Sequence, residues 1–242
     1  MDFRDLGLRA ALLRAVREQG NTIPTPIQAR AIPAILSGRD VTAAAQTGSG
    51  KTAAFALPML QRLMGVRCGS SRSVRALVMV PTRELAAQIA RSVRTYGAHL
   101  PFQCSVIFGG VGMQPPVEAL RRGIDIVAAT PGQFLDHASR GSIDLSEVEI
   151  LVLDEANRML DMGFIHDIRR ALALMPARRQ NLLFSATVPD GVKVLAGQLL
   201  EGPKLIEAGR QNSGPATFEQ GVYRVNRGPK AELQAELEHR GG

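Results

Sequence analysis

Short apolar runs recur along most of the chain, and glycine, proline or charged residues separate them. Runs of this length, rich in Val, Ile, Leu and Ala, predict strands that are buried on both faces. The runs are VTAAA (41–45), RALVMVP (75–81), QCSVIF (103–108), DIVAAT (125–130), EILVLD (149–154) and NLLFSAT (181–187).

Between these runs lie segments with helical periodicity, of which RELAAQIARSVRTYGAHL (83–100) is the clearest. Strands that alternate with helices predict an α/β domain, with a central parallel sheet covered by helices on both faces. In such a sheet ligands bind at the carboxyl ends of the strands. The residues that follow each apolar run are therefore candidates for ligand binding.

After residue 207 the alternation stops at AGRQNSGPATFEQG (208–221), which is polar, rich in small residues and typical of a linker. The residues beyond it are too few to fold as a second domain. A length of 242 residues suits one large α/β domain followed by a tail, and the sequence contains no internal repeat.

The composition limits the compartment and the kinds of partner that the protein can have. No apolar run approaches the ~18 residues of a membrane span, and charges interrupt the apolar N-terminus, so a cytoplasmic protein without a membrane anchor is expected. Cys68 and Cys104 lack the spacing of paired metal ligands. A net charge of +7 favours an anionic partner such as nucleic acid. Of only four lysines, Lys51 is the first along the chain.

The segment AAQTGSGKT (44–52) follows the first predicted strand and opens a helix. Gly48 and Gly50 allow the dihedral angles and the close approach by which backbone N–H groups surround phosphate oxygens. Lys51 would then reach the β- and γ-phosphates, and the Thr52 hydroxyl would ligate Mg²⁺. Ala45 replaces the first glycine of the general pattern. The alternative is a tight glycine turn that binds nothing.

Two carboxylates, Asp154 and Glu155, end the strand EILVLD. In the same sheet Asp154 would lie near the Mg²⁺, and Glu155 could position or deprotonate the water that attacks the γ-phosphate. Together with Lys51, these acids predict a site that hydrolyses a nucleotide.

Seven short motifs follow one another along the chain: PTPIQ (24–28), AAQTGSGKT (44–52), PTRELA (81–86), GG (109–110), TPG (130–132), DEA (154–156) and SAT (185–187). With these motifs in this order, the chain resembles the DEAD-box RNA helicases, and specifically the bacterial RhlE-like group, over essentially its whole length. The resemblance implies a RecA-like domain at 37–207, an N-terminal extension at 1–36, and a linker with the start of a second RecA-like domain at 208–242.

The resemblance assigns the nucleotide contacts. Gln28 would read the adenine edge, and Phe3 would stack on the adenine ring unless it merely covers the core. Asn21 stands where an aromatic residue is usual, which affects the packing of the loop at the nucleotide's edge. The implied ligands of ATP and Mg²⁺ are Phe3, Thr25, Gln28, Gln46, Thr47, Gly48, Ser49, Gly50, Lys51 and Thr52, with Asp154 on the metal.

The resemblance also implies an RNA groove that holds backbone phosphates and therefore ignores base sequence. Gln133 replaces the arginine usual after TPG, which would weaken RNA binding and reduce its salt dependence by roughly one charge. The implied RNA-contacting residues are Pro81, Thr82, Arg83, Gly109, Gly110, Thr130, Gly132 and Gln133.

Asn157 replaces the last acid of the DEAD motif. The resemblance implies that this position accepts hydrogen bonds from Ser185 and Thr187, which would couple the nucleotide to the RNA groove. An amide keeps the acceptor but changes a charge-assisted bond into a neutral one, which we expect to impair coupling more than ATP binding. A tolerated variation without consequence is the alternative.

The resemblance implies ATP-dependent RNA unwinding by a longer protein, whose second RecA-like domain supplies arginine fingers. This chain alone is expected to bind adenine nucleotide weakly, to hydrolyse it very slowly and to unwind nothing. The alternatives are a non-catalytic module that binds RNA or a protein partner, and a P-loop ATPase that acts on DNA or in transport. No pattern in the sequence predicts an oligomeric state.

Overall fold

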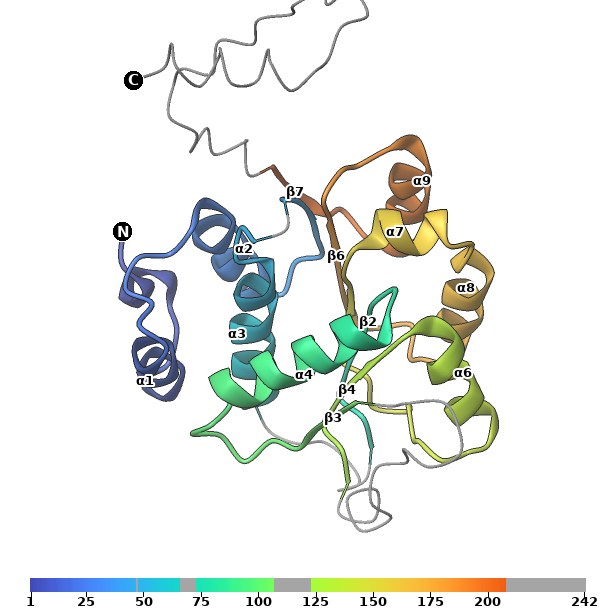
Figure 1. Cartoon of the computed structure of the whole chain (residues 1–242), viewed down its shortest axis with the longest axis horizontal. Helices are drawn as coiled ribbons and strands as arrows, with labels where there is room; N and C mark the ends of the chain where they lie inside the picture. Colours follow the sequence, from blue (N-terminus) through green and yellow to red (C-terminus); the bar gives the residue numbers. More distant parts are fainter. Residues whose placement is uncertain (47, 66–72, 107–122, 208–242) are drawn as a thin grey trace, which may run out of the picture. The chain divides into compact units, whose positions relative to one another are not determined.

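The computed structural model describes residues 1–46, 48–65, 73–106 and 123–207, which belong to one compact unit, Met1–Arg210. Its centre is a sheet of seven strands in the order β3-β4-β2-β5-β6-β1-β7, and every described pairing is parallel (Figure 1). The strands are β1 (Val41–Ala44), β2 (Ala76–Met79), β3 (Cys104–Val106), β4 (Ile126–Ala129), β5 (Ile150–Leu153), β6 (Gln180–Ser185) and β7 (Lys204–Glu207).

The six apolar runs of the sequence correspond to β1 to β6, so the predicted α/β sheet is confirmed. The seventh strand, β7, was not predicted. It lies at the edge of the sheet and pairs with β1 alone, and only Ile206 of its residues is buried. An edge strand with one buried side chain lacks the continuous apolar run that identifies a central strand.

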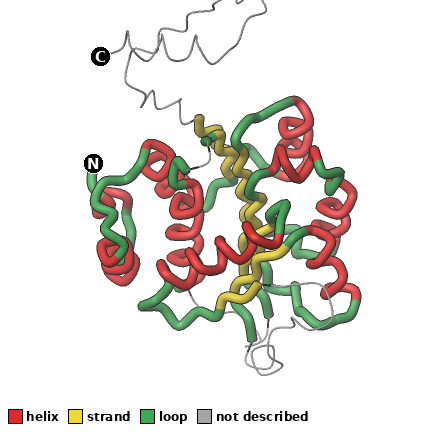
Figure 2. Tube along the Cα trace, in the orientation of Figure 1, coloured by secondary structure: helices red, strands yellow, loops and turns green. Residues whose placement is uncertain are grey.

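Helices cover both faces of the sheet, with α1 to α4 on one side of the strands and α6 to α9 on the other (Figures 1 and 2). A separate hydrophobic cluster lies under each group of helices. The helices are η1 (Phe3–Leu6), α1 (Ala10–Glu18), α2 (Pro26–Leu36), α3 (Lys51–Leu63), α4 (Arg83–Tyr96), α6 (Pro131–Ser139), α7 (Ala156–Asp161), α8 (Ile165–Ala173) and α9 (Asp190–Leu199).

Helix α4 is the segment with the clearest helical period, and it ends at Tyr96, four residues before the predicted end at 100. Gly97 follows it, where a Cβ atom would lie 2.9 Å from the carbonyl oxygen of Val93. A side chain at position 97 would therefore crowd the last helical turn, which favours glycine after the end of α4.

The sheet order brings the important loops together. Strand β6 lies between β5 and β1, and β2 follows β5 on the other side. Because all these strands are parallel, their carboxyl ends meet at one edge. The loops after β1, β5 and β6 are therefore neighbours, and the loops after β2 and β4 continue the same edge. Among the described residues, no helix is long and apolar enough to cross a membrane.

Candidate nucleotide and RNA site

The loop after β1 has the backbone that its glycines predict. Gly48 and Gly50 adopt φ values of +83° and +89°, in the left-handed region. Ala45, which replaces the first glycine of the pattern, is buried and donates its N–H to the carbonyl of Ser185 at 3.0 Å. This position therefore extends the β1–β6 ladder, where a Cβ atom is accommodated.

Lys51 is the first residue of α3, and its side chain is only 6% exposed. Its Nζ donates a hydrogen bond of 2.5 Å to Oε1 of Glu155, whose side chain is 8% exposed. An ion pair this well buried requires close geometry, because both charges have lost most of their water. The two motifs, 104 residues apart in the sequence, thus form one site.

Glu155 is the only described residue other than glycine with a positive φ, at 55°. It caps α7 at its N-terminus, and its N–H donates to Oδ1 of Asp154 at 2.9 Å. Left-handed backbone is costly for a residue with a side chain and is found where its surroundings enforce it. The turn therefore directs two adjacent carboxylates into the same site.

Burial raises the pKa of Asp154 to about 6, and the Glu155 charge acts in the same direction, whereas Lys51 and the Glu155 N–H oppose the shift. The folded state thus binds the Asp154 proton more tightly than the unfolded state does. As the pH rises from about 4 to about 6, the unfolded state loses this proton first and the fold becomes less stable.

Asp154→Asn is therefore expected to raise the free energy of unfolding by about 2 kcal/mol at pH 7 and by almost nothing near pH 4. Asparagine keeps the oxygen that accepts from the Glu155 N–H. Urea unfolding of both proteins across this pH range measures the difference. A gain of the same size at both pH values would contradict the raised pKa.

The side chain of Gln28 connects α2 to the loop. Its Oε1 accepts from the N–H of Thr25 at 2.9 Å, and its Nε2 donates to the carbonyl of Gly50 at 3.2 Å. Thr25 and Gln28 form the capping box of α2, and the buried Thr25 hydroxyl faces the same glycine. Both side chains therefore lie where the start of α2 meets the phosphate-binding loop.

Gly50→Ala and Gly48→Ala form a matched pair for this arrangement. Both create a left-handed alanine, but only at position 50 would the Cβ atom meet Nε2 of Gln28, at 2.4 Å, whereas position 48 has open space. We expect losses in the free energy of unfolding of about 2 kcal/mol for Gly50→Ala and about 1 kcal/mol for Gly48→Ala. Urea unfolding compares them, and equal losses would contradict the close approach of Gln28.

The remaining predicted nucleotide residues have varied settings. Thr52 follows Lys51 on α3, and Ser49 Oγ donates to the carbonyl of the exposed Gln46 at 2.6 Å. Thr47 lies outside the described residues. Phe3 is buried in the hydrophobic core with 3% exposure, which fits the alternative that its ring covers the core; its stacking on adenine stays a prediction. Asn21 is exposed.

The segments PTRELA and TPG follow β2 and β4, which pair with each other. Each opens a helix: Thr82 caps α4 and accepts from the Leu85 N–H at 3.3 Å, and Thr130 occupies the N-cap position of α6. Two helix N-termini, with their unsatisfied N–H groups, therefore begin side by side at the same edge of the sheet.

Exposure differs among the other residues predicted to contact RNA. Arg83 and Gly132 are exposed, Pro81 is buried, and Gln133 is buried within α6 with 8% exposure. A buried Gln133 does not extend from the surface toward an RNA strand, so its contact with RNA stays a prediction. Gly109 and Gly110 lie outside the described residues.

Ser185 and Asn157 make the contact that the sequence predicts. Ser185 Oγ donates to Oδ1 of Asn157 at 2.8 Å and accepts from the Asn157 N–H at 3.2 Å. The end of β6 is thus bound to the first turn of α7, next to Glu155. Thr187 is exposed, and no hydrogen bond between it and Asn157 is present in the structure, so its part in this contact stays a prediction.

Two interactions in the site were not predicted from the sequence: the direct Lys51–Glu155 pair and the contact of Gln28 with Gly50. The sequence offered a signal for the first, since an isolated lysine and a carboxylate at the ends of two buried strands are natural partners. The second depends on how α2 packs against α3, which no local pattern reveals.

Comparison with known proteins agrees with this geometry. Residues 25–195 match the family profile described as DEAD/DEAH box helicase. The chain is 42% identical to the DEAD-box ATP-dependent RNA helicase RhpA of Helicobacter pylori (strain B128), over 95% of this chain and 46% of the relative. It is 44% identical to the ATP-dependent RNA helicase DeaD of Escherichia coli (strain K12), over 84% of this chain and 32% of the relative.

The chain therefore spans about half or less of the length of these curated relatives. Among solved structures, the crystal structure of a DEAD box protein from the hyperthermophile Methanococcus jannaschii superposes with a TM-score of 0.78 at 37% identity, over 86% of this chain and 56% of that chain. The predicted RecA-like fold is thereby confirmed, whereas the RhlE-like subgroup stays a prediction. Because the family profile covers most of the chain and includes both strand-end motifs of the site, the chain belongs to the DEAD/DEAH box helicase family.

Proposed function

We propose that this chain is the ATP-binding half of a DEAD-box RNA helicase and contributes part of its RNA-binding surface. The observation that carries the proposal is the buried Lys51–Glu155 pair, which joins the phosphate-binding loop to the acids after β5. A structural ion pair alone would not explain why its lysine begins a helix behind two left-handed glycines. That combination is typical of phosphate binding.

The residues fit an adenine nucleotide with Mg²⁺. Each amide atom of Gln28 keeps a second hydrogen-bonding position for the base. Thr52 and Asp154 would hold Mg²⁺, which prefers oxygen ligands and takes few of them from a protein. When bound, the ion would neutralise charge on the phosphates.

Lys51 and Glu155 would have separate roles in the reaction. Lys51 would leave Glu155 and bind the β- and γ-phosphates, because a phosphate carries more charge than the carboxylate it replaces. Glu155, released from the pair, would orient a water molecule and accept its proton. Nucleotide binding would thus replace Glu155 by phosphates as the partner of Lys51. Glu155 would then be available as the general base.

The RNA-binding half of the proposal concerns α4 and α6. Their N-termini lie side by side, and backbone N–H groups at such positions favour the phosphates of a nucleic acid strand. Arg83 is exposed on the first turn of α4 and would add a charge. Contacts of this kind predict binding that does not depend on base sequence. We propose the cytosol as the compartment.

Asn157→Asp is expected to increase RNA-stimulated ATP turnover by about five-fold in a version that carries the second RecA-like domain. The Ser185–Asn157 hydrogen bond would become charge-assisted, a difference of about 1 kcal/mol. Nucleotide affinity of the present chain should not change. Steady-state turnover with and without RNA measures the effect, with Asn157→Ala as the variant that removes the acceptor; unchanged stimulation would contradict the coupling role.

The proposed function is tested by ATP turnover of the two-domain version in the presence of single-stranded RNA or DNA of the same sequence. We expect RNA to stimulate ATP turnover. Glu155→Gln should abolish this turnover, because glutamine keeps the shape of the site but cannot act as a general base. Equal stimulation by DNA would favour an ATPase that acts on DNA. Absence of turnover under all conditions would favour a non-catalytic binding module.

A further inference from the structure

A polar cavity of about 670 Å³ lies at the opposite end of the sheet from the nucleotide site. It is lined at the amino ends of β1 and β6 and around the end of α9, by residues 38–40, 177–179, 181, 198–199 and 201–202. Because β1 and β6 are parallel, their amino ends border this cavity, whereas their carboxyl ends hold the phosphate-binding loop and Ser185. The cavity therefore shares no residue with the proposed ATP and RNA sites.

Three arginines line the cavity: Arg39, Arg178 and Arg179. None of them forms a salt bridge with a carboxylate in the part of the chain that the structure describes. Arg179 donates from Nε to Oδ1 of Asn181 at 3.0 Å and from Nη1 to the Pro176 carbonyl at 2.5 Å, which leaves its Nη2 group without a hydrogen bond among the described residues. Arg39 makes only a long bond of 3.5 Å to the Gly202 carbonyl. The guanidinium groups thus keep donors for a ligand.

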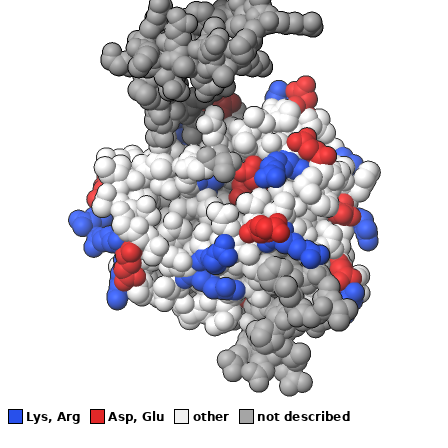
Figure 3. Space-filling model, viewed as in Figure 1, with Lys and Arg blue, Asp and Glu red and all other residues white. Residues whose placement is uncertain are grey.

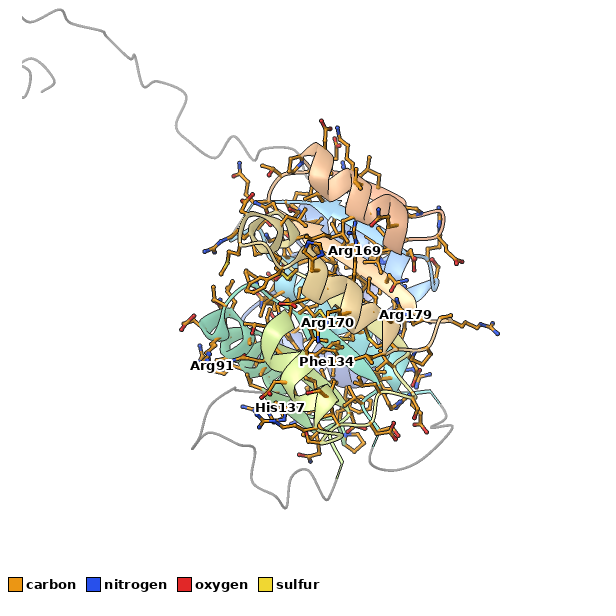
Figure 4. The ribbon with its side chains drawn as sticks, turned by 90° about the vertical axis from the view of Figure 1, so that its right-hand side faces the viewer. Arg91, Phe134, His137, Arg169, Arg170 and Arg179 are labelled. Carbon is orange, nitrogen blue, oxygen red and sulfur yellow. The ribbon has the colours of Figure 1, made fainter. Side chains whose placement is uncertain are left out.

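Exposed arginines with an acidic partner provide a comparison. Arg14 pairs with Glu18 and Arg140 with Asp136, each at 2.9 Å. On the face drawn in Figure 3, basic and acidic groups are interspersed. In Figure 4 Arg179 lies on the segment that leads into β6, and Arg170 on α8 has Asp167 within 3.8 Å. What distinguishes Arg39, Arg178 and Arg179 is that all three line one cavity.

The two carboxylates of the lining do not neutralise these arginines by direct contact. Asp40 is buried, and its oxygens accept the N–H groups of Asn181 at 2.8 Å and of Glu201 at 2.9 Å. Asp40 acts on Arg179 only through space, because no salt bridge joins the two among the described residues. The Glu201 side chain is exposed and forms no salt bridge among the described residues. The hydrogen-bond donors that remain for a ligand in the cavity are therefore those of the three arginines.

We propose that this cavity binds a compact group of phosphates, held by Arg39, Arg178 and Arg179. The planar guanidinium group forms paired hydrogen bonds with phosphate oxygens, and arginine is the residue best suited to this task. The volume lies within the range of small-ligand pockets, about 300–1,000 Å³. The phosphates belong either to a free polyphosphate or to the backbone of a nucleic acid strand, since both present the same oxygens.

Desolvation agrees with this assignment. Partial burial lowers the pKa of Arg179, and the Asp40 charge acts in the opposite direction. A cation that has lost part of its water gains more from an anion than a fully exposed one does. Arg179 is accordingly the anchor of the site, and the exposed Arg39 and Arg178 close around the ligand.

The test uses the whole chain with Lys51→Ala and Glu155→Gln, so that the phosphate-binding loop does not compete. Titration calorimetry at low salt follows sodium tripolyphosphate in one arm and a short single-stranded RNA in the other. We expect saturable binding in at least one arm, weakened about ten-fold or more by Arg39→Ala with Arg178→Ala. The matched control is Arg14→Ala with Arg140→Ala, which removes the same charge from exposed, paired arginines and should change affinity less than two-fold.

The outcomes separate the possibilities. A loss confined to the tripolyphosphate arm identifies a small ligand, and a loss confined to the RNA arm identifies nucleic acid; both support the site. No saturable binding in either arm overturns the proposal, as does an equal loss in the matched control, which would show attraction by net charge alone. Because the test protein lacks Lys51, its result is independent of the proposed ATP site.

Discussion

Lys51→Ala is expected to lower the free energy of unfolding by about 3 kcal/mol, and to weaken ATP binding by more than about 100-fold. The first effect arises because the Glu155 carboxylate, 8% exposed, would be left buried without its cation. The second arises because the same amine is proposed to bind the phosphates. Lys51→Ala thus tests both the ion pair of the nucleotide-free protein and the proposed phosphate contact of the nucleotide-bound protein.

A double-mutant cycle separates the two effects. In the combined variant Lys51→Ala with Glu155→Gln no unpaired charge remains, so stability should largely return while nucleotide affinity stays low. Urea unfolding and nucleotide titration measure the two quantities. A Lys51→Ala protein as stable as the parent would show that Glu155 is solvated, and would contradict the buried pair.

Joining the second RecA-like domain to this chain is expected to raise ATP turnover by on the order of 10³-fold or more, in the presence of RNA. In the proposed mechanism Lys51, Asp154 and Glu155 bind the phosphates, the metal and the water, and the site is expected to lack only the arginine that stabilises the additional charge of the transition state. Arginine fingers from the second domain would stabilise that charge.

Single-turnover kinetics of the present chain and of the two-domain version provide the comparison. Alanine substitution of the finger arginines should return the rate to that of the isolated chain, and Glu155→Gln should abolish turnover in both. The expectation fails if the isolated chain hydrolyses ATP as fast as the longer version.

Much of the fold could be predicted because β1 to β6 are central strands, whose continuous apolar runs stand out between polar loops. The edge strand β7 could not, because only Ile206 is buried there. Gly48 and Gly50 were also predictable, since no other residue tolerates their dihedral angles well. These features depend on local chemistry, which the sequence displays directly.

The features that the sequence did not reveal depend on how distant elements pack. The side chain of Gln28 lies against Gly50 because α2 packs on α3. Glu155 has a left-handed backbone at the point where it pairs with the distant Lys51. Gln133 was expected in the RNA groove, but its setting in α6 is buried. Gln133 and Phe134, which Figure 4 labels, are both buried residues of α6, and burial on a short helix depends on the elements that pack against it.

The central claim is that this chain binds an adenine nucleotide between Gln28 and the phosphate-binding loop. Calorimetric titration with ADP, ATP and GDP in the presence of Mg²⁺ tests it most directly, on the chain and on Gln28→Ala. We predict binding of ADP and ATP but not of GDP, weakened about ten-fold or more by the substitution, because the amide supplies both hydrogen bonds to the base. Equal affinity for GDP, or no binding of any nucleotide, would contradict the claim.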